Sequence, residues 1–168
     1  MANGKVVLKL GDDISTDIIY PGRFMATVLP TETPQYAFAD DAGFNQALTE
    51  KQIPAGSFIV AGDNFGCGSS REQAASCIMG HGLRVVARNF ARIFLQNSIN
   101  VGLQMIICPG IEAEEDHELE IREGKVWNLS TGKSFAIESL PKARQAIIDA
   151  GGLIPYTRRL LLERADAA

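Results

Sequence analysis

Four short apolar runs stand out in the first two thirds of the chain. Each has the length and the β-branched content of a buried strand, and they occupy residues 5–10, 57–61, 83–87 and 103–108. Residues 69–82 and 89–102 lie between the later runs and carry the apolar spacing of helices. The second of these helices is expected to place on one face Phe90, Ile93, Phe94 and Asn97. Buried strands that alternate with helices are typical of an α/β fold.

The pattern changes after residue 110. Polar and apolar residues alternate over residues 111–139, with glycine-containing turns at 123–124 and 131–132. This alternation predicts an antiparallel hairpin or meander that is exposed on one face. Pro141 then opens a helical tail, about residues 141–168, whose first helix is closed by two glycines.

A long segment near the N-terminus follows neither period. Residues 22–43 contain Pro30, Pro34 and several threonines and aspartates, and we expect a flexible loop there before a short helix at 44–50. Long loops in compact domains are often lids or binding loops. We therefore predict one α/β domain, residues 1–168, that carries a functional loop.

Composition narrows the class of function. A chain of 168 residues that is 46% hydrophobic is typical of one globular domain. The net charge of −4, without a lysine or arginine cluster, argues against a nucleic-acid partner. No apolar run approaches the roughly 20 residues that cross a bilayer, so no membrane partner is expected. The N-terminus lacks the apolar stretch of a signal peptide, and a cytoplasmic location is the expectation.

The cysteines argue against metal chemistry within this chain. There are three of them, Cys67, Cys77 and Cys108, and they form no C-x-x-C pair. An odd number without paired spacing favours neither a disulfide framework nor a zinc or iron–sulfur site. No metal ligand is therefore predicted here, and any metal would have to come from elsewhere.

The glycine-rich turn at residues 66–72 carries the most chemistry. Ser69 and Glu72 have the spacing of a capping box, which predicts Ser69 as a helix N-cap. The free N–H groups at a helix start attract anions, and the glycines allow a ligand to approach closely. Arg71 would add a bidentate contact to a carboxylate. The alternative is an ordinary capped helix with Arg71 as a solvated surface charge, and the residues alone leave both open.

Three motifs in this order resemble one enzyme family. They are DDISTDIIYPG at 12–22, GDNFGCGSSREQAA at 62–75 and RNFARIFLQNSINVGL at 88–103. With them, the chain resembles the small subunits of isopropylmalate isomerase (3-isopropylmalate dehydratase) and homoaconitase over nearly its whole length. Those subunits are similar to the last domain of single-chain aconitases. The resemblance implies a swivelling domain with three layers in the order β/β/α.

The resemblance also implies a function, in leucine biosynthesis. Enzymes of this family are hydro-lyases that remove and re-add water, and a large partner subunit carries a [4Fe–4S] cluster. The small subunit is inactive alone and binds no cofactor itself. By similarity, Ser69 is the general base, Ser70 and Arg71 hold substrate carboxylates, and Asp17 belongs to the substrate site as a residue that orients its groups.

The loop after Gly22 departs from the family pattern. Many members have Tyr-Leu-Arg there, with the arginine on the substrate, and Ala26 stands where that arginine is expected. Arg23 is close enough in sequence to replace it. Phe24 and Met25 suggest an apolar wall that suits a branched or methylated malate. The expected specificity segment is Phe24, Met25, Ala26 and Thr27.

The substrate stays open among several hydroxy acids. 3-Isopropylmalate is the leading candidate, and dimethylmalate, citramalate and homocitrate are the alternatives. A different class of function, a stand-alone anion-binding module without catalysis, is also open because a fold does not fix a function. The intact Ser69, Ser70 and Arg71 favour the enzyme.

Overall fold

The computed structural model describes residues 2–166, and a mixed seven-stranded sheet runs through it in the order β4-β3-β2-β1-β5-β6-β7. The neighbouring strands β1, β2, β3 and β4 pair in parallel. The pairs β1–β5, β5–β6 and β6–β7 are antiparallel. The strands are β1 (Ala2–Lys9), β2 (Phe58–Ala61), β3 (Arg84–Ala87), β4 (Met105–Ile107), β5 (Glu118–Arg122), β6 (Lys125–Asn128) and β7 (Lys133–Ala136).

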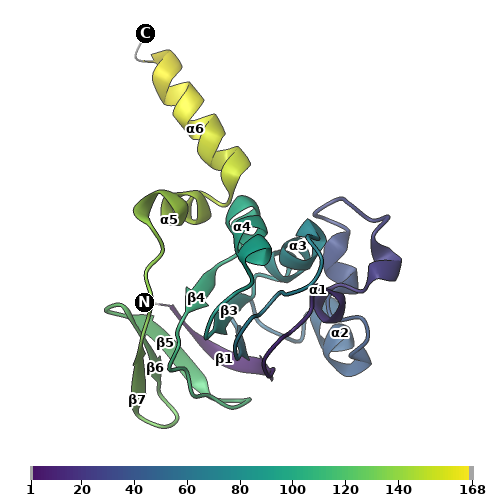
Figure 1. Ribbon diagram of the computed structural model, residues 1–168, viewed down its shortest axis with the longest axis vertical. Coiled ribbons are helices and arrows are strands. Elements are labelled where there is room, and N and C mark those ends of the chain that lie inside the picture. The colour runs from purple at the N-terminus through teal and green to yellow at the C-terminus, as the bar shows by residue number, and fades with distance from the viewer. Residues whose placement is uncertain (1, 167–168) are drawn as a thin grey trace.

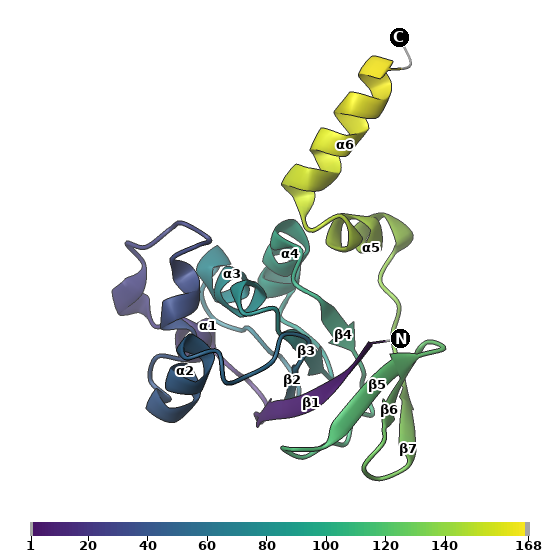
Figure 2. The same ribbon diagram turned by 180° about the vertical axis from the view of Figure 1, so that it is seen from behind.

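Helices connect the parallel strands and close the chain. They are α1 (Thr16–Ile19), α2 (Ala42–Thr49), α3 (Glu72–Gly80), α4 (Arg92–Val101), α5 (Lys142–Asp149) and α6 (Leu153–Asp166). Two 3-10 helices, η1 (Gly22–Phe24) and η2 (Thr33–Tyr36), lie in the segment between α1 and α2. Figures 1 and 2 show α3 and α4 along one face of the parallel strands and α6 extending away from the body.

Alternate residues of the parallel strands face two different cores. Ile59 and Val85 belong to the cluster that also contains the buried residues of α3 and α4. Phe58 and Val86 belong to a second cluster, which includes Leu119 of β5 and further residues of the antiparallel part. Both faces of the parallel strands are therefore covered, one by helices and one by strands. This confirms the α/β fold with β/β/α layers.

The antiparallel section and the two tail helices form as the sequence predicts, and the differences are local. Helix α4 begins at Arg92 because Phe90 is extended and bridges to Phe65. Phe94 is buried, whereas Ile93, which was predicted to share a face with it, is 45% exposed. The predicted long loop contains η2, whose Thr33 is fully buried.

No helix within residues 2–166 combines the length and the apolar character that a bilayer crossing requires. The single swivelling domain and the flexibility of segment 22–43 stay predictions.

Candidate active site

The turn that follows β2 packs against the loop that follows β1. Because these two strands are parallel neighbours, their carboxyl ends lie at the same edge of the sheet. Ser15 and Cys67 form an isolated parallel bridge there, and the N–H of Gly66 donates to the carbonyl of Ile14 at 2.7 Å. Gly66 has φ +82°, and a Cβ on it would collide with the ring of Phe94. Internal packing therefore requires the glycine at 66.

Helix α3 begins later than the capping box predicts. Its N-cap is Arg71, with φ −65° and ψ 114°, and no side chain caps the helix. The prediction that Ser69 caps this helix is wrong, because Ser69 lies two residues ahead of the N-cap. The backbone N–H groups of residues 70–73 have no hydrogen-bond partner within residues 2–166. The helix start thus keeps free the donors that an anion would use.

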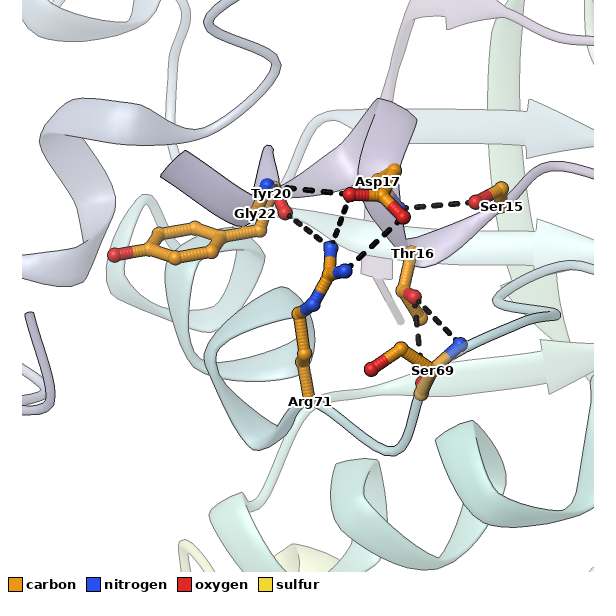
Figure 3. A network of polar contacts seen from close by, with 7 residues as sticks. All are labelled: Ser15, Thr16, Asp17, Tyr20, Gly22, Ser69 and Arg71. Atoms are coloured by element: carbon orange, nitrogen blue, oxygen red, sulfur yellow. Dashed lines mark hydrogen bonds and ion pairs between the residues drawn. The ribbon is translucent and has the colours of Figure 1, made fainter. Parts of the chain in front are cut away.

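Asp17 and Arg71 form the strongest polar contact at this turn. Arg71 Nη1 donates to Asp17 Oδ1 at 2.5 Å, and Nη2 donates to Oδ2 at 3.0 Å. Nη1 also donates to the carbonyl of Tyr20 at 3.2 Å, so α1 holds the guanidinium from two sides (Figure 3). The hydrogen bonds from Arg71 hold the pKa of the Asp17 carboxyl below its ordinary value.

The fork of Arg71 is therefore directed at Asp17 and not at open solvent. The Arg71 side chain is 11% exposed, whereas that of Asp17 is 58% exposed. Nε of Arg71 is buried without a hydrogen-bond partner within the described residues. In this arrangement Arg71 has only part of its donor set left for a substrate carboxylate, most directly the second hydrogen of Nη2.

The two serines are held by their backbones. Thr16 Oγ1 lies 3.2 Å from the N–H of Ser69 and 3.3 Å from its carbonyl oxygen. Asn97 Nδ2 donates to the carbonyl of Ser70 at 3.0 Å. The Ser69 hydroxyl makes no hydrogen bond within residues 2–166, and Figure 3 shows it on the side of the turn where the Arg71 side chain lies. A hydroxyl without an internal partner is available for a ligand.

The predicted site residues thus fall into two groups. Ser69, Ser70, Arg71 and Asp17 come together where α1 meets the start of α3. Arg23 pairs instead with Asp40 at 2.5 Å and stacks over the ring of Phe24 with its guanidinium carbon 4.6 Å from the centroid.

The segment after Gly22 covers an aromatic cluster. Phe24 stacks on Tyr36 with ring centroids 4.1 Å apart, and Tyr20 meets both rings edge-on. Met25 is 49% exposed, Ala26 is exposed and Thr27 is half-buried. The apolar character of this segment is thus divided between a packed Phe24 and an outward Met25.

The donor groups for a metal cluster are not assembled among the residues that the structure describes. Among residues 2–166, no three His, Cys, Asp or Glu side chains are grouped so that they could hold a metal ion. Burial raises the pKa of the Cys108 thiol to about 11 and that of Cys77 further, which disfavours the thiolate form that binds iron. Cys67 is half-buried and free. The donor set of the described residues therefore does not fit an iron–sulfur cluster.

Sequence analysis missed three residues of this site. Thr16 is 1% exposed and Tyr20 is fully buried, and both use polar atoms to hold the turn from α1. Asn97 does so from α4. The four-residue α1 is too short to give a periodic signal. In the sequence, the only hint of these contacts was the polar Thr16 within the motif at residues 12–22.

Comparisons with known proteins identify the family of the chain. The family model described as the aconitase C-terminal domain matches residues 12–109. The small subunit 1 of 3-isopropylmalate dehydratase from Methanopyrus kandleri is 44% identical, and the match covers 89% of this chain and 88% of that protein. The small subunit of 2,3-dimethylmalate dehydratase from Eubacterium barkeri is 41% identical, with 89% and 93% covered. The crystal structure of 3-isopropylmalate dehydratase from Methanocaldococcus jannaschii matches with a TM-score of 0.89 and 36% identity, and covers 99% of each chain.

Proposed function

Because the chain belongs to the aconitase C-terminal domain family, we propose that it is the small subunit of a hydro-lyase, 3-isopropylmalate dehydratase of leucine biosynthesis. The observation that carries the proposal is the meeting of Ser69, Ser70 and Arg71 at an uncapped helix start. Relatives that match nearly the whole chain are named for this activity. Their names as small subunits support a larger partner.

We infer that the partner subunit holds a [4Fe–4S] cluster, since the described residues of this chain offer no donor set for one. When bound, the cluster would supply Lewis-acid chemistry at the substrate hydroxyl. Activity would then require both subunits, because neither carries the full set of groups. This chain would provide the base and the carboxylate contacts.

In this proposal the deprotonated Ser69 oxygen takes the proton from the carbon next to a substrate carboxylate and becomes the neutral hydroxyl. A serine hydroxyl is a very weak acid, so its deprotonated form needs strong local stabilisation. The free N–H groups of residues 70–73 and the positive end of α3 provide donors close by. The absence of an internal partner for the hydroxyl supports this role, because no competing bond has to be broken first.

Ser70 and Arg71 would bind a substrate carboxylate. Ser70 is exposed beside the free N–H groups, and Nη2 of Arg71 keeps one hydrogen beyond its bond to Asp17. Asp17 would fix the plane of the guanidinium and so the direction of that remaining hydrogen. Each group then has a separate part in binding, and only Ser69 moves a proton.

One observation favours a second substrate. Ala26 lacks the charged group expected at this loop position, and a relative at 41% identity is named for 2,3-dimethylmalate. Both acids are malates with apolar branches, and they differ in how bulky the branch is. The exposed Met25 offers an apolar contact for either of them. We propose 3-isopropylmalate as the main substrate and 2,3-dimethylmalate as the alternative.

Co-expression with the large subunit encoded in the same genome tests the proposal. The purified complex is assayed for dehydration of 3-isopropylmalate, 2,3-dimethylmalate, citramalate and homocitrate, with the complex of Ser69→Ala as the matched control. We expect the highest kcat/KM with 3-isopropylmalate and loss of turnover in the variant. Absence of turnover with every acid, together with tight binding of one of them by this chain alone, would favour the anion-binding module instead.

A further inference from the structure

Each of the three residues at this turn is hydrogen-bonded to a residue elsewhere in the chain, and Arg71 is also bonded to the carbonyl of Tyr20. Ser69 is bonded to Thr16, Ser70 to Asn97 and Arg71 to Asp17. Thr16 and Asp17 are adjacent in α1, and their partners are 53 and 54 residues away in the chain. The tertiary structure thus fixes the turn at three successive positions, and Figure 3 shows the contacts at Ser69 and Arg71.

The contact of Thr16 differs in kind from the other two. Its single hydroxyl accepts from the N–H of Ser69 at 3.2 Å and donates to the carbonyl of the same residue at 3.3 Å. These two groups lie on either side of the Ser69 Cα, so fixing both of them fixes the direction of the Cα–Cβ bond. Rotation about this one bond is then the only freedom left that sets the position of the hydroxyl oxygen. Thr16 therefore constrains where Oγ of Ser69 can lie.

The hydroxyl of Thr16 has no other role in the described structure. Ser15, not Thr16, caps α1, because Ser15 Oγ accepts from the N–H of Asp17 at 3.0 Å. The N–H of Thr16 donates to the carbonyl of Cys67 at 2.8 Å, which anchors the backbone independently of the side chain. Thr16 is 1% exposed, so water does not compete for its hydroxyl. The only hydrogen bonds of that hydroxyl within residues 2–166 are the two to Ser69.

We propose that Thr16 is a positioning residue that aims the Ser69 hydroxyl at the reacting carbon. This inference rests on the proposed function, because it assigns Thr16 a part in the same reaction. Thr16 touches no substrate, and its removal should affect the placement of the base more than the binding of the carboxylate. A misplacement near 1 Å at a reacting group can cost about 100-fold in rate.

Steady-state kinetics of the complex with its partner subunit test the role. For Thr16→Val, which keeps the shape and removes the hydroxyl, we expect kcat to fall about 10- to 100-fold while KM changes less than about threefold. Thr16→Ser keeps the hydroxyl and should restore most of the rate. Ser57→Ala is the matched control: Ser57 is also buried and its hydroxyl donates to a backbone carbonyl, of Pro54 at 2.7 Å, but it precedes β2 and lies away from the turn.

A second measurement does not depend on activity. Amide hydrogen exchange of Ser69, followed by NMR on this chain, should be about 3- to 10-fold faster in Thr16→Val and unchanged in Ser57→Ala, because one hydrogen bond contributes about 0.5–1.5 kcal/mol. If the wild-type complex turns over no acid, the proposed function fails, while the exchange result still decides whether Thr16 holds the turn.

Three outcomes would overturn the proposal. They are an unchanged kcat in Thr16→Val, a loss of rate no larger than in Ser57→Ala, and an unchanged exchange rate of the Ser69 amide. Should Thr16→Val fail to fold, Thr16→Cys replaces it under the same criteria, since a thiol of similar size bonds more weakly.

Discussion

Substitution of Ser69 by alanine separates the proposed catalytic role of this side chain from a structural one. The change removes a hydroxyl that has no hydrogen-bond partner within residues 2–166, and it retains both backbone bonds to Thr16. Because Arg71 is the N-cap of α3, no cap is lost. We therefore expect the free energy of unfolding to change by less than about 0.5 kcal/mol. A true N-cap serine would instead lose about 1 kcal/mol.

The melting temperature converts this difference into a measurable quantity. For a chain of 168 residues, 1 kcal/mol shifts Tm by roughly 2–4 °C, so Ser69→Ala should stay within about 2 °C of the wild type. Turnover should respond very differently. General base catalysis contributes about 100- to 10,000-fold, and we expect kcat of the complex to fall by about that factor.

The assay follows the conjugated double bond of the dehydrated acid by its ultraviolet absorbance. Size-exclusion chromatography of the complex confirms that the subunits still associate. Ser70→Ala is the neighbouring control, and it should raise KM more than it lowers kcat because Ser70 is assigned to substrate binding. A kcat of Ser69→Ala within tenfold of the wild type would remove Ser69 as the base, and a Tm loss near 4 °C would restore the capping role.

Further predictions concern the residues around this turn. Arg71→Lys should raise KM about tenfold, because one ammonium cannot reproduce the bidentate geometry toward Asp17; unchanged kinetics would contradict a carboxylate role. The pKa of Asp17 is lowered in the folded chain by its pairing with Arg71. The stability that this pair contributes is therefore complete above the unfolded pKa of about 4 and is lost as pH falls through the folded value. An NMR titration midpoint of Asp17 at or above about 4 would refute this. Asn97→Ala releases the carbonyl of Ser70 and should raise KM about threefold in initial-rate measurements. An unchanged KM would show that Asn97 does not hold Ser70 for substrate binding. If Arg23 replaces the missing loop arginine, Arg23→Ala raises KM about tenfold, whereas an unaffected KM would leave it only its pair with Asp40.

Local pattern was sufficient for most elements of the fold. The strands at 58–61 and 84–87 were predicted within one residue, because short, mostly apolar runs record burial on both faces. The antiparallel section at 118–136 was predicted from alternation. Helix α1 was not predicted, because four residues are too few for a 3.6-residue period.

The candidate site was only partly predictable. Ser69, Ser70 and Arg71 are adjacent in the sequence, and the motif resemblance singled them out with Asp17. The capping-box prediction was wrong because the S-x-x-E pattern considers only local hydrogen bonds. In the fold, the backbone of Ser69 is instead bonded to Thr16, which keeps Ser69 in the turn before the helix. A rule based on the spacing of nearby residues cannot include Thr16, which lies 53 residues from Ser69 in the chain.

The sequence by itself determined most of the strands and the longer helices, and which short turn carries two hydroxyls and a guanidinium. Only the tertiary structure decided that Asp17 occupies the fork of Arg71 and that Thr16 fixes the backbone of Ser69. The physical reason is that hydrophobic periodicity records the burial of each side chain, whereas these contacts arise from the parallel pairing of β1 and β2. That pairing brings together two loops that are separate in the chain.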